Sequence, residues 1–148
     1  MPQTTGQTSW RNAVIEYSTD SITWVDISGV GNKVGHGGGD RAIGEAYTGA
    51  SDTAILTLGK REPLQLETDI VYSEATADQY ANLENCYLNG TALKLRWAPK
   101  GSATGNFRYT SDTGYLGTFT PPVGEYGSGD PILISFELNT PSYSRAAM

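Results

Sequence analysis

Strict alternation of apolar and polar side chains marks the segment Leu64-Gln65-Leu66-Glu67-Thr68-Asp69-Ile70-Val71-Tyr72. Successive side chains of a β-strand point to opposite faces, so every second residue lies on the same side. Leu64, Leu66, Thr68, Ile70 and Tyr72 therefore share one face, and Gln65, Glu67 and Asp69 share the other. We expect a strand with one core face and one acidic face.

Two hairpins are expected upstream of this strand. The first pairs a strand at residues 13–17 with one at 22–27 that carries Trp24, across a turn at 18–21. The second pairs strands at 41–48 and 53–58 across the turn Gly49-Ala50-Ser51-Asp52. Short runs of β-branched and aromatic residues separated by glycine, serine and aspartate are typical of antiparallel hairpins.

One helix is expected downstream, from about Ala77 to Leu88. Thr76 and Gln79 form the pattern of a capping box, Asp78 suits the positive helix end, and Asn89-Gly90 supplies a stop. A stripe at helical spacing, which we expect to pack on a sheet, contains Tyr80, Leu83 and Tyr87.

Further strands follow the helix. We expect one at residues 93–97, a hairpin that joins Phe107 and Tyr109 to Tyr115 and Phe119, and a last strand at 132–138 whose even-numbered residues are apolar. The predicted fold class is mainly β: an antiparallel β-sandwich or partly closed barrel with one flanking α-helix, at about Ala77 to Leu88.

Length, charge and cysteine content limit the function classes. The 148 residues fit a single domain, 1–148, and the net charge of −6 disfavours a surface that grips nucleic acid. The lone cysteine, Cys86, indicates a reducing compartment. Neither a signal peptide nor a run of about 20 apolar residues is present, so we expect no membrane association.

No credible catalytic or cofactor site is found, and we expect a protein that is not an enzyme. His36-Gly37-Gly38-Gly39 resembles an oxyanion loop, but the G-x-S-x-G elbow is absent and His36 is the only histidine. One histidine and one cysteine cannot form a closed zinc site, so no metal is predicted. Glu67 and Asp69 are too close in sequence to flank a glycosidic bond.

Three segments lack residues that could anchor them in a lone globule. These are a polar N-terminal arm, a glycine-rich stretch at 29–40 that we expect to be a mobile loop, and a C-terminal tail at 140–148. Sheet edges and extended arms are common means of pairing with a neighbouring chain. Self-assembly is therefore the leading hypothesis.

The sequence resembles the tail tube proteins, or major tail proteins, of long-tailed bacteriophages. The segments that carry the resemblance are the opening hairpin from Val14-Ile15-Glu16-Tyr17 to Trp24-Val25-Asp26-Ile27, the stretch Gly39-Asp40-Arg41-Ala42-Ile43-Gly44-Glu45-Ala46-Tyr47-Thr48, and Gly59-Lys60-Arg61-Glu62-Pro63 before the alternating strand.

This resemblance implies a structural virion protein without a cofactor. Members of the family form hexameric rings that stack into a hollow tube, with other tail proteins at its ends and DNA as a passing, non-specific cargo. It implies a location in the virion tail after assembly in the host cytoplasm. An acidic lumen would repel DNA during ejection.

The resemblance also assigns roles to particular residues. Glu67 and Asp69, with Glu45 on a neighbouring strand, would line the channel, although the last strand with Glu137 could do so instead. Contacts between subunits or rings would involve Gly31, Asn32, Val34, His36 and Arg41.

A carbohydrate-binding module is the alternative. Trp24, Trp97 and the nine tyrosines could form a stacking platform for sugars in a monomeric β-sandwich, although aromatic residues on alternating strands more often fill a core.

Overall fold

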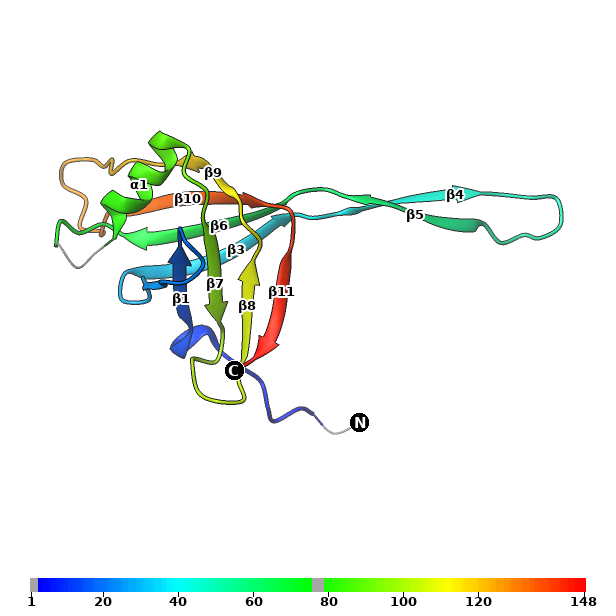
Figure 1. The fold of residues 1–148 in the computed structure, drawn as a ribbon, viewed down its shortest axis with the longest axis horizontal. Helices are drawn as coiled ribbons and strands as arrows, with labels where there is room; N and C mark the ends of the chain where they lie inside the picture. Colours follow the sequence, from blue (N-terminus) through cyan, green and yellow to red (C-terminus); the bar gives the residue numbers. More distant parts are fainter. Residues whose placement is uncertain (1–2, 76–78) are drawn as a thin grey trace.

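Two antiparallel sheets, one helix and a long projecting hairpin make up the computed structural model, which describes residues 3–75 and 79–148 (Figure 1). The mainly β fold class is confirmed, and the sheets do not close into a barrel within the described chain. The elements are a 3₁₀ turn at Trp10–Asn12, β1 (Val14–Ser18), β2 (Val25–Asp26), β3 (Gly31–Gly38), β4 (Arg41–Ala46), β5 (Ile55–Arg61), β6 (Leu64–Val71), α1 (Tyr80–Asn89), β7 (Lys94–Ala98), β8 (Phe107–Ser111), β9 (Tyr115–Phe119), β10 (Leu133–Thr140) and β11 (Tyr143–Ala147).

The first sheet has the strand order β11-β8-β7-β1-β2, and the second has the order β3-β6-β10-β9. Strands β4 and β5 pair only with each other and extend away from both sheets (Figure 1). No described helix is long and apolar enough to cross a membrane.

The core lies between the two sheets, and β6 and β10 supply its centre. On β6 the exposed fractions of Leu64, Leu66, Thr68 and Ile70 are 3%, 1%, 0% and 1%, as the alternation predicts. The even-numbered residues of β10 are buried from position 134 to 140. Buried side chains from the first sheet and the helix complete the cluster; they include Ile15, Tyr17, Leu83, Cys86, Leu93 and Leu95.

Helix α1 ends as predicted. Gly90 has φ of 65°, a left-handed conformation that suits glycine, and its N–H is directed at the carbonyls of Cys86 and Tyr87. Leu83 is fully buried in the core, and α1 contacts β9. The predicted helix start at Ala77, with Thr76 and Asp78, lies outside the described residues.

The prediction of a mobile loop at 29–40 is wrong over most of its length. Strand β3 occupies Gly31–Gly38 and pairs with β6, with Val34 opposite Thr68 and His36 opposite Leu66. Backbone hydrogen bonds to a neighbouring strand need no side chains, so glycines that cannot pack can still form a strand. Val34 is the residue of β3 that packs against the core.

Two predictions near the C-terminus are also wrong. Strands β8 and β9 do not form a hairpin, because β8 pairs with β7 and β11 whereas β9 pairs with β10 in the other sheet. Residues 140–148 are not a free tail, because β11 pairs with β8 over five positions. The chain therefore passes from one sheet to the other between residues 111 and 115.

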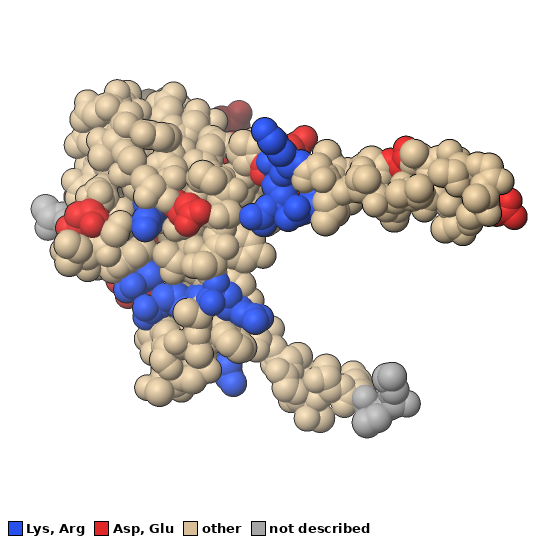
Figure 2. All heavy atoms as spheres, turned by 45° about the vertical axis from the view of Figure 1, so that its right-hand side comes forward, with Lys and Arg blue, Asp and Glu red and all other residues tan. Residues whose placement is uncertain are grey.

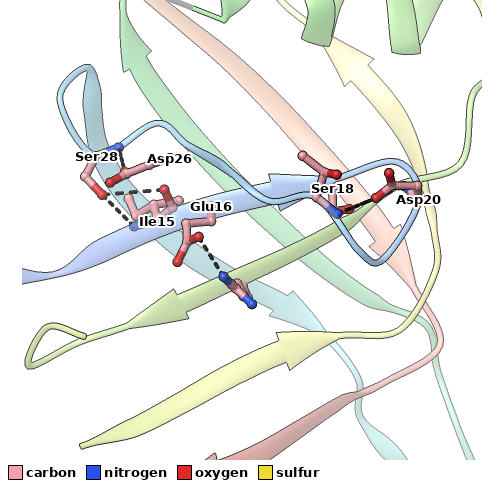
Figure 3. Close-up of polar contacts among 8 residues, drawn as sticks. Ile15, Glu16, Ser18, Asp20, Asp26 and Ser28 are labelled. Atoms are coloured by element: carbon pink, nitrogen blue, oxygen red, sulfur yellow. Dashed lines mark hydrogen bonds and ion pairs between the residues drawn. The ribbon is translucent and has the colours of Figure 1, made fainter. Parts of the chain in front are cut away.

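The N-terminal hairpin forms, but its second strand is shorter than predicted. Only Val25–Asp26 pairs with β1, and Ile22 is 84% exposed. The Asp20 carboxylate accepts a hydrogen bond from the Ser18 hydroxyl (Figure 3). It also accepts hydrogen bonds from the backbone N–H groups of Ile22 and Thr23, which holds residues 18–23 in a wide turn. These bonds satisfy the amides that a longer strand would have paired.

Candidate assembly surfaces

The projecting hairpin is a direct continuation of β3 and β6. Beyond the second sheet, the Gly39 N–H donates to the Pro63 carbonyl at 3.0 Å, and the Glu62 N–H donates to the Asp40 carbonyl at 2.8 Å. These bonds join β3–β6 to β4–β5 in one long ribbon. We call residues 41–61 the arm (Figure 1).

The arm has two unlike faces, because residues paired across a ladder lie on the same side. Ile43 pairs with Leu58 and Glu45 pairs with Leu56, which gives one face of bulky aliphatic side chains and a carboxylate. The other face is formed mainly by small residues, namely Ala42, Gly44, Ala46, Thr57 and Gly59, with Ile55 at one end.

The arm's aliphatic residues are exposed to an unusual degree. Every residue of β4 and β5 is exposed, and the exposed fractions of Ile43, Leu56 and Leu58 are 57%, 67% and 73%. Contiguous exposed apolar residues commonly mark an interaction surface. These residues were not predicted as an interaction surface, although their spacing along the predicted hairpin was a usable signal.

The outward face of the second sheet is polar over most of its length, with the apolar pair Val71 and Leu133 at one end. We call it the polar face; it contains Lys33 on β3, Gln65, Glu67 and Asp69 on β6, and Ser135, Glu137 and Asn139 on β10. The Lys33 ammonium lies 3.4 Å from the Asp69 carboxylate and 4.0 Å from that of Glu67. The Ser135 hydroxyl donates to Asp69 at 2.6 Å. Three carboxylates and one ammonium leave a net charge of −2 on this face.

Two of the three residues predicted to line a channel lie together, and the third does not. Glu67 and Asp69 lie on the polar face, where Glu137 stands directly opposite Glu67, so the alternative strand belongs to the same surface. Glu45 lies on the arm, because β4 pairs with β5 and not with β6. Its expected position on a strand beside β6 is wrong.

The second sheet has two outer strands, β3 and β9, each paired on one side only among the described strands. The residues predicted to contact other subunits follow the β3 edge: Gly31, Asn32, Val34 and His36 lie on β3, and Arg41 begins β4. Basic side chains gather where the arm leaves the body (Figure 2). Residues Arg41, Lys60 and Arg61 lie at this end of the arm.

The three helix residues expected to pack have different surroundings. Leu83 is buried in the core, Tyr80 lies edge-to-face with Tyr72 at 5.0 Å between ring centroids, and Tyr87 stacks on Phe119 at 6.2 Å. The helix is thus held against the C-terminal ends of β6 and β9.

A third surface is aromatic. The first sheet extends below the second, which leaves part of its inner side uncovered (Figure 1). By strand pairing, this part carries Phe107, Tyr109, Tyr143 and Arg145 beside Trp97. Trp97 stacks on Tyr109 at 5.7 Å, and the Arg145 guanidinium lies 4.7 Å from the Phe107 ring centroid. We call these five residues the aromatic surface.

The described residues contain no group of three or more histidine, cysteine or acidic side chains that could hold a metal ion. Burial raises the pKa of the Cys86 thiol, which keeps it protonated and unreactive. Hydrogen bonds from the backbone N–H groups of Ile22 and Thr23 lower the pKa of the Asp20 carboxyl, and the same bonds form the turn at residues 18–23.

Comparison with known proteins identifies the fold. No protein-family model and no curated protein matches the sequence. Solved structures do match. A chain of the sheath–tube complex of an extracellular contractile injection system, PVC, in its extended state aligns with a TM-score of 0.72 at 12% identity, over 97% of this chain and 94% of that one.

Two further structures have the same fold. A chain of the baseplate of the anti-feeding prophage aligns with a TM-score of 0.69 at 8% identity, over 99% of this chain and 98% of that one. The SPP1 tail tube aligns with a TM-score of 0.67 at 15% identity, over 96% of this chain and 80% of that one. The chain has the fold of proteins found in phage tails and phage-like injection systems.

Proposed function

We propose that this chain is a structural, non-enzymatic subunit of a tail-like tube, in which six copies form a ring and the rings stack into a hollow conduit. The observation that carries the proposal is the arm, whose strands pair only with each other and whose aliphatic residues Ile43, Leu56 and Leu58 are more than half exposed. Leaving each such side chain in water forgoes about 1.5–3 kcal/mol of burial energy. Identical neighbours can recover that energy by covering the arm.

Ring closure uses the two outer strands of the second sheet. If β3 of one copy pairs with β9 of the next, the four-stranded sheets join into a continuous barrel and both outer strands of this sheet gain a partner. The predicted contact residues Gly31, Asn32, Val34 and His36 then lie between subunits. Head-to-tail contacts of this kind generate closed rings when the rotation between copies closes.

The polar face lines the lumen in this arrangement. Its net charge of −2 per copy, repeated around a ring, repels a nucleic acid backbone and prevents it from adhering to the wall. Glu67, Asp69 and Glu137 supply the negative charge, and Lys33 offsets part of it. The passing cargo is DNA, which is ejected through the tube without sequence-specific contact.

The arm and the N-terminal segment connect successive rings. The whole chain, 1–148, is one assembly unit, located in the virion tail after assembly in the host cytoplasm. Its partners are copies of itself and end proteins of the tail. Similar chains occur in a sheath/tube terminator and in a tube-terminating cap, which supports a partner of that kind at the tube end.

Oligomeric state tests this proposal directly. The purified full chain is studied by size-exclusion chromatography over a range of concentration and salt, and by negative-stain microscopy. Rings or tubes with a central hole are expected. A monomer under every condition would refute the proposal.

Cysteine accessibility tests which face lines the hole. The variant E67C should react with a small maleimide in tubes and in monomers, but with a large polymer-linked maleimide only in monomers. The unassembled variant is its own control, and native Cys86 is buried. Equal reaction of tubes with both reagents would place Glu67 outside the lumen.

A glycan-binding module receives less support from the geometry. The Trp24 ring is covered by the Arg96 guanidinium at 4.1 Å, and Trp97 is stacked on Tyr109. Arg96 is in turn paired with Glu16 at 2.8 Å, so the cover is fixed. A sugar platform needs ring faces that are free to stack, and both tryptophans use theirs within the chain.

A further inference from the structure

The aromatic surface consists of four aromatic side chains and one basic side chain, that of Arg145. Phe107 and Tyr143 are 51% and 48% exposed, although both lie on the side of the first sheet that elsewhere forms the core. A cavity of about 170 Å³ opens at its upper end, between the two sheets, and is lined by Val34, Leu66, Trp97, Tyr109 and Tyr143 among others. The surface ends in a second hollow beside Phe107 and Lys100.

We infer that the aromatic surface of one copy receives the arm of a second copy, with Glu45 of the arm against Arg145 of the surface. This inference rests on the proposed function and specifies which surface the arm occupies. Three observations carry this inference. Both surfaces are apolar, their charged residues have opposite signs, and a second apolar hollow on the body carries acidic residues that would repel Glu45.

The apolar match concerns the bulky face of the arm. Ile43, Leu56 and Leu58 lie on one side of the arm and are at least half exposed. The aromatic surface offers rings and an open cavity that could receive one of these aliphatic side chains. Aromatic residues are enriched at protein interfaces because they bury a large area at little conformational cost.

The charge match concerns the same two faces. Glu45 lies between the arm's aliphatic residues, opposite Leu56, and Arg145 lies opposite Tyr109 on the aromatic surface. Neither forms an ion pair within residues 3–75 and 79–148. Beyond the basic residues at its base, the arm carries Glu45 and Asp52 and no basic side chain over residues 42–59. This part of the arm is electrostatically favoured against a surface that carries Arg145 and ends beside Lys100.

Another apolar hollow on the body carries acidic residues, which would repel the acidic residues of the arm. A hollow at the end of the body opposite the arm is lined by Val123, Tyr126, Ile132 and Leu133, but also by Glu125 and Asp130. Placing Glu45 and the arm's Asp52 there would bring like charges together, which costs free energy at an interface. Charge therefore favours the aromatic surface as the docking site.

Charge exchange tests the inference on the full chain. The variants E45R and R145E should each raise the concentration at which half the protein assembles by about tenfold or more, because each places like charges in contact. The double variant E45R/R145E should return that concentration to within about threefold of wild type, because the pair is restored in reverse. Circular dichroism and urea midpoints check that every variant folds.

Failure of this inference can be told from failure of the proposed function. If wild type assembles but the double variant is no better than the worse single variant, the arm docks elsewhere and tube formation stands. If wild type never assembles, the proposed function fails and the docking site with it.

A disulfide trap gives an independent result in a C86S background. Copies carrying L56C are mixed with copies carrying F107C under assembly conditions and oxidised. A cross-linked dimer confined to the mixture supports the docking site. Its absence from microscopically normal tubes, together with a dimer when L56C is mixed with Y126C, would assign the arm to the opposite end of the body and overturn the inference.

Discussion

The two halves of the long ribbon follow the same alternating design but end in opposite environments. In the body half, Leu66 and Ile70 of β6 are each 1% exposed, whereas in the arm half Leu56 and Leu58 of β5 are 67% and 73% exposed. Neighbouring layers of the same chain cover the first pair, whereas the second pair lies on a ribbon that no other described strand pairs with. Alternation predicts a strand with an apolar side, but it does not tell whether the partner of that side lies in the same molecule.

The difference separates folding from assembly. Side chains of the body half contribute to the free energy of unfolding of one copy, and those of the arm half contribute mainly to the free energy of association. Substitutions in the body half should therefore change the stability of the monomer, whereas substitutions in the arm half should change assembly.

The largest expected loss of stability comes from the centre of the body. Phe136 on β10 is 1% exposed and stands opposite Thr68 of β6 and Phe119 of β9. Phe136→Ala should lower the free energy of unfolding by about 3–5 kcal/mol, because it removes buried surface and leaves a cavity. Urea denaturation followed by circular dichroism measures the loss. A change below about 1 kcal/mol would contradict the assignment of this position to the core.

The second prediction concerns the junction between the two halves. Gly38 has φ of 64°, and a Cβ at this position would lie 2.5 Å from the Pro63 carbonyl oxygen. Gly38→Ala should lower the free energy of unfolding by about 1–3 kcal/mol through strain and steric conflict. Gly29→Ala is the matched control, because a Cβ there meets nothing within 4 Å and the backbone conformation is ordinary. Equal losses in the two variants would refute the local argument.

A third, smaller effect should have the opposite sign. The Thr68 hydroxyl is fully buried and has no hydrogen-bond partner among the described residues. Thr68→Val keeps the shape and removes the unpaired polar atom, so it should raise the free energy of unfolding by about 1 kcal/mol. Thr140→Val is the control: the Thr140 hydroxyl donates to the Asp112 carbonyl at 2.8 Å, and its loss should destabilise. Destabilisation by both variants would indicate that Thr68 has a partner.

Much of the fold could be predicted from the sequence, because local periodicity reports local structure. The alternation in β6 and β10, the hairpin that became the arm and the glycine stop after α1 all follow from residues near one another in the chain. These are the features for which a short window contains the physical cause.

Features that depend on distant partners were not predictable in this way. Four of the eight residues of β3 are glycines and only Val34 of this strand packs against the core, so the strand depends on its hydrogen bonds to β6. Tyr115 and Phe119 share aromatic character with β8, yet β9 belongs with β10 because the chain changes sheet at Gly114. Pairing of strands distant in sequence leaves little trace in local composition.

The candidate lumen residues show the same difference between local and long-range causes. Glu67 and Asp69 were placed together because they lie on one strand, whereas Glu45 was misplaced because its position depends on which strand β4 pairs with. The arm's apolar residues could not be recognised as an interaction surface from the sequence, because local sequence does not show that β4 and β5 pair only with each other.

The smallest expected change in stability tests the comparison most sharply. Leu58→Ser on the arm should change the free energy of unfolding of the monomer by less than about 0.5 kcal/mol, because the side chain is already in water. The same variant should markedly reduce assembly, since the lost aliphatic contact is made between copies. Urea denaturation at low concentration and sedimentation at high concentration measure the two quantities separately.

The control is Leu66→Ser in the body half of the ribbon. This variant should strongly destabilise the monomer, and any loss of assembly should follow from unfolding. If Leu58→Ser instead destabilised the monomer by several kcal/mol, the arm would have to fold back onto its own chain in solution. Its apolar face would then belong to the core, and the separation of folding from assembly in this ribbon would not hold.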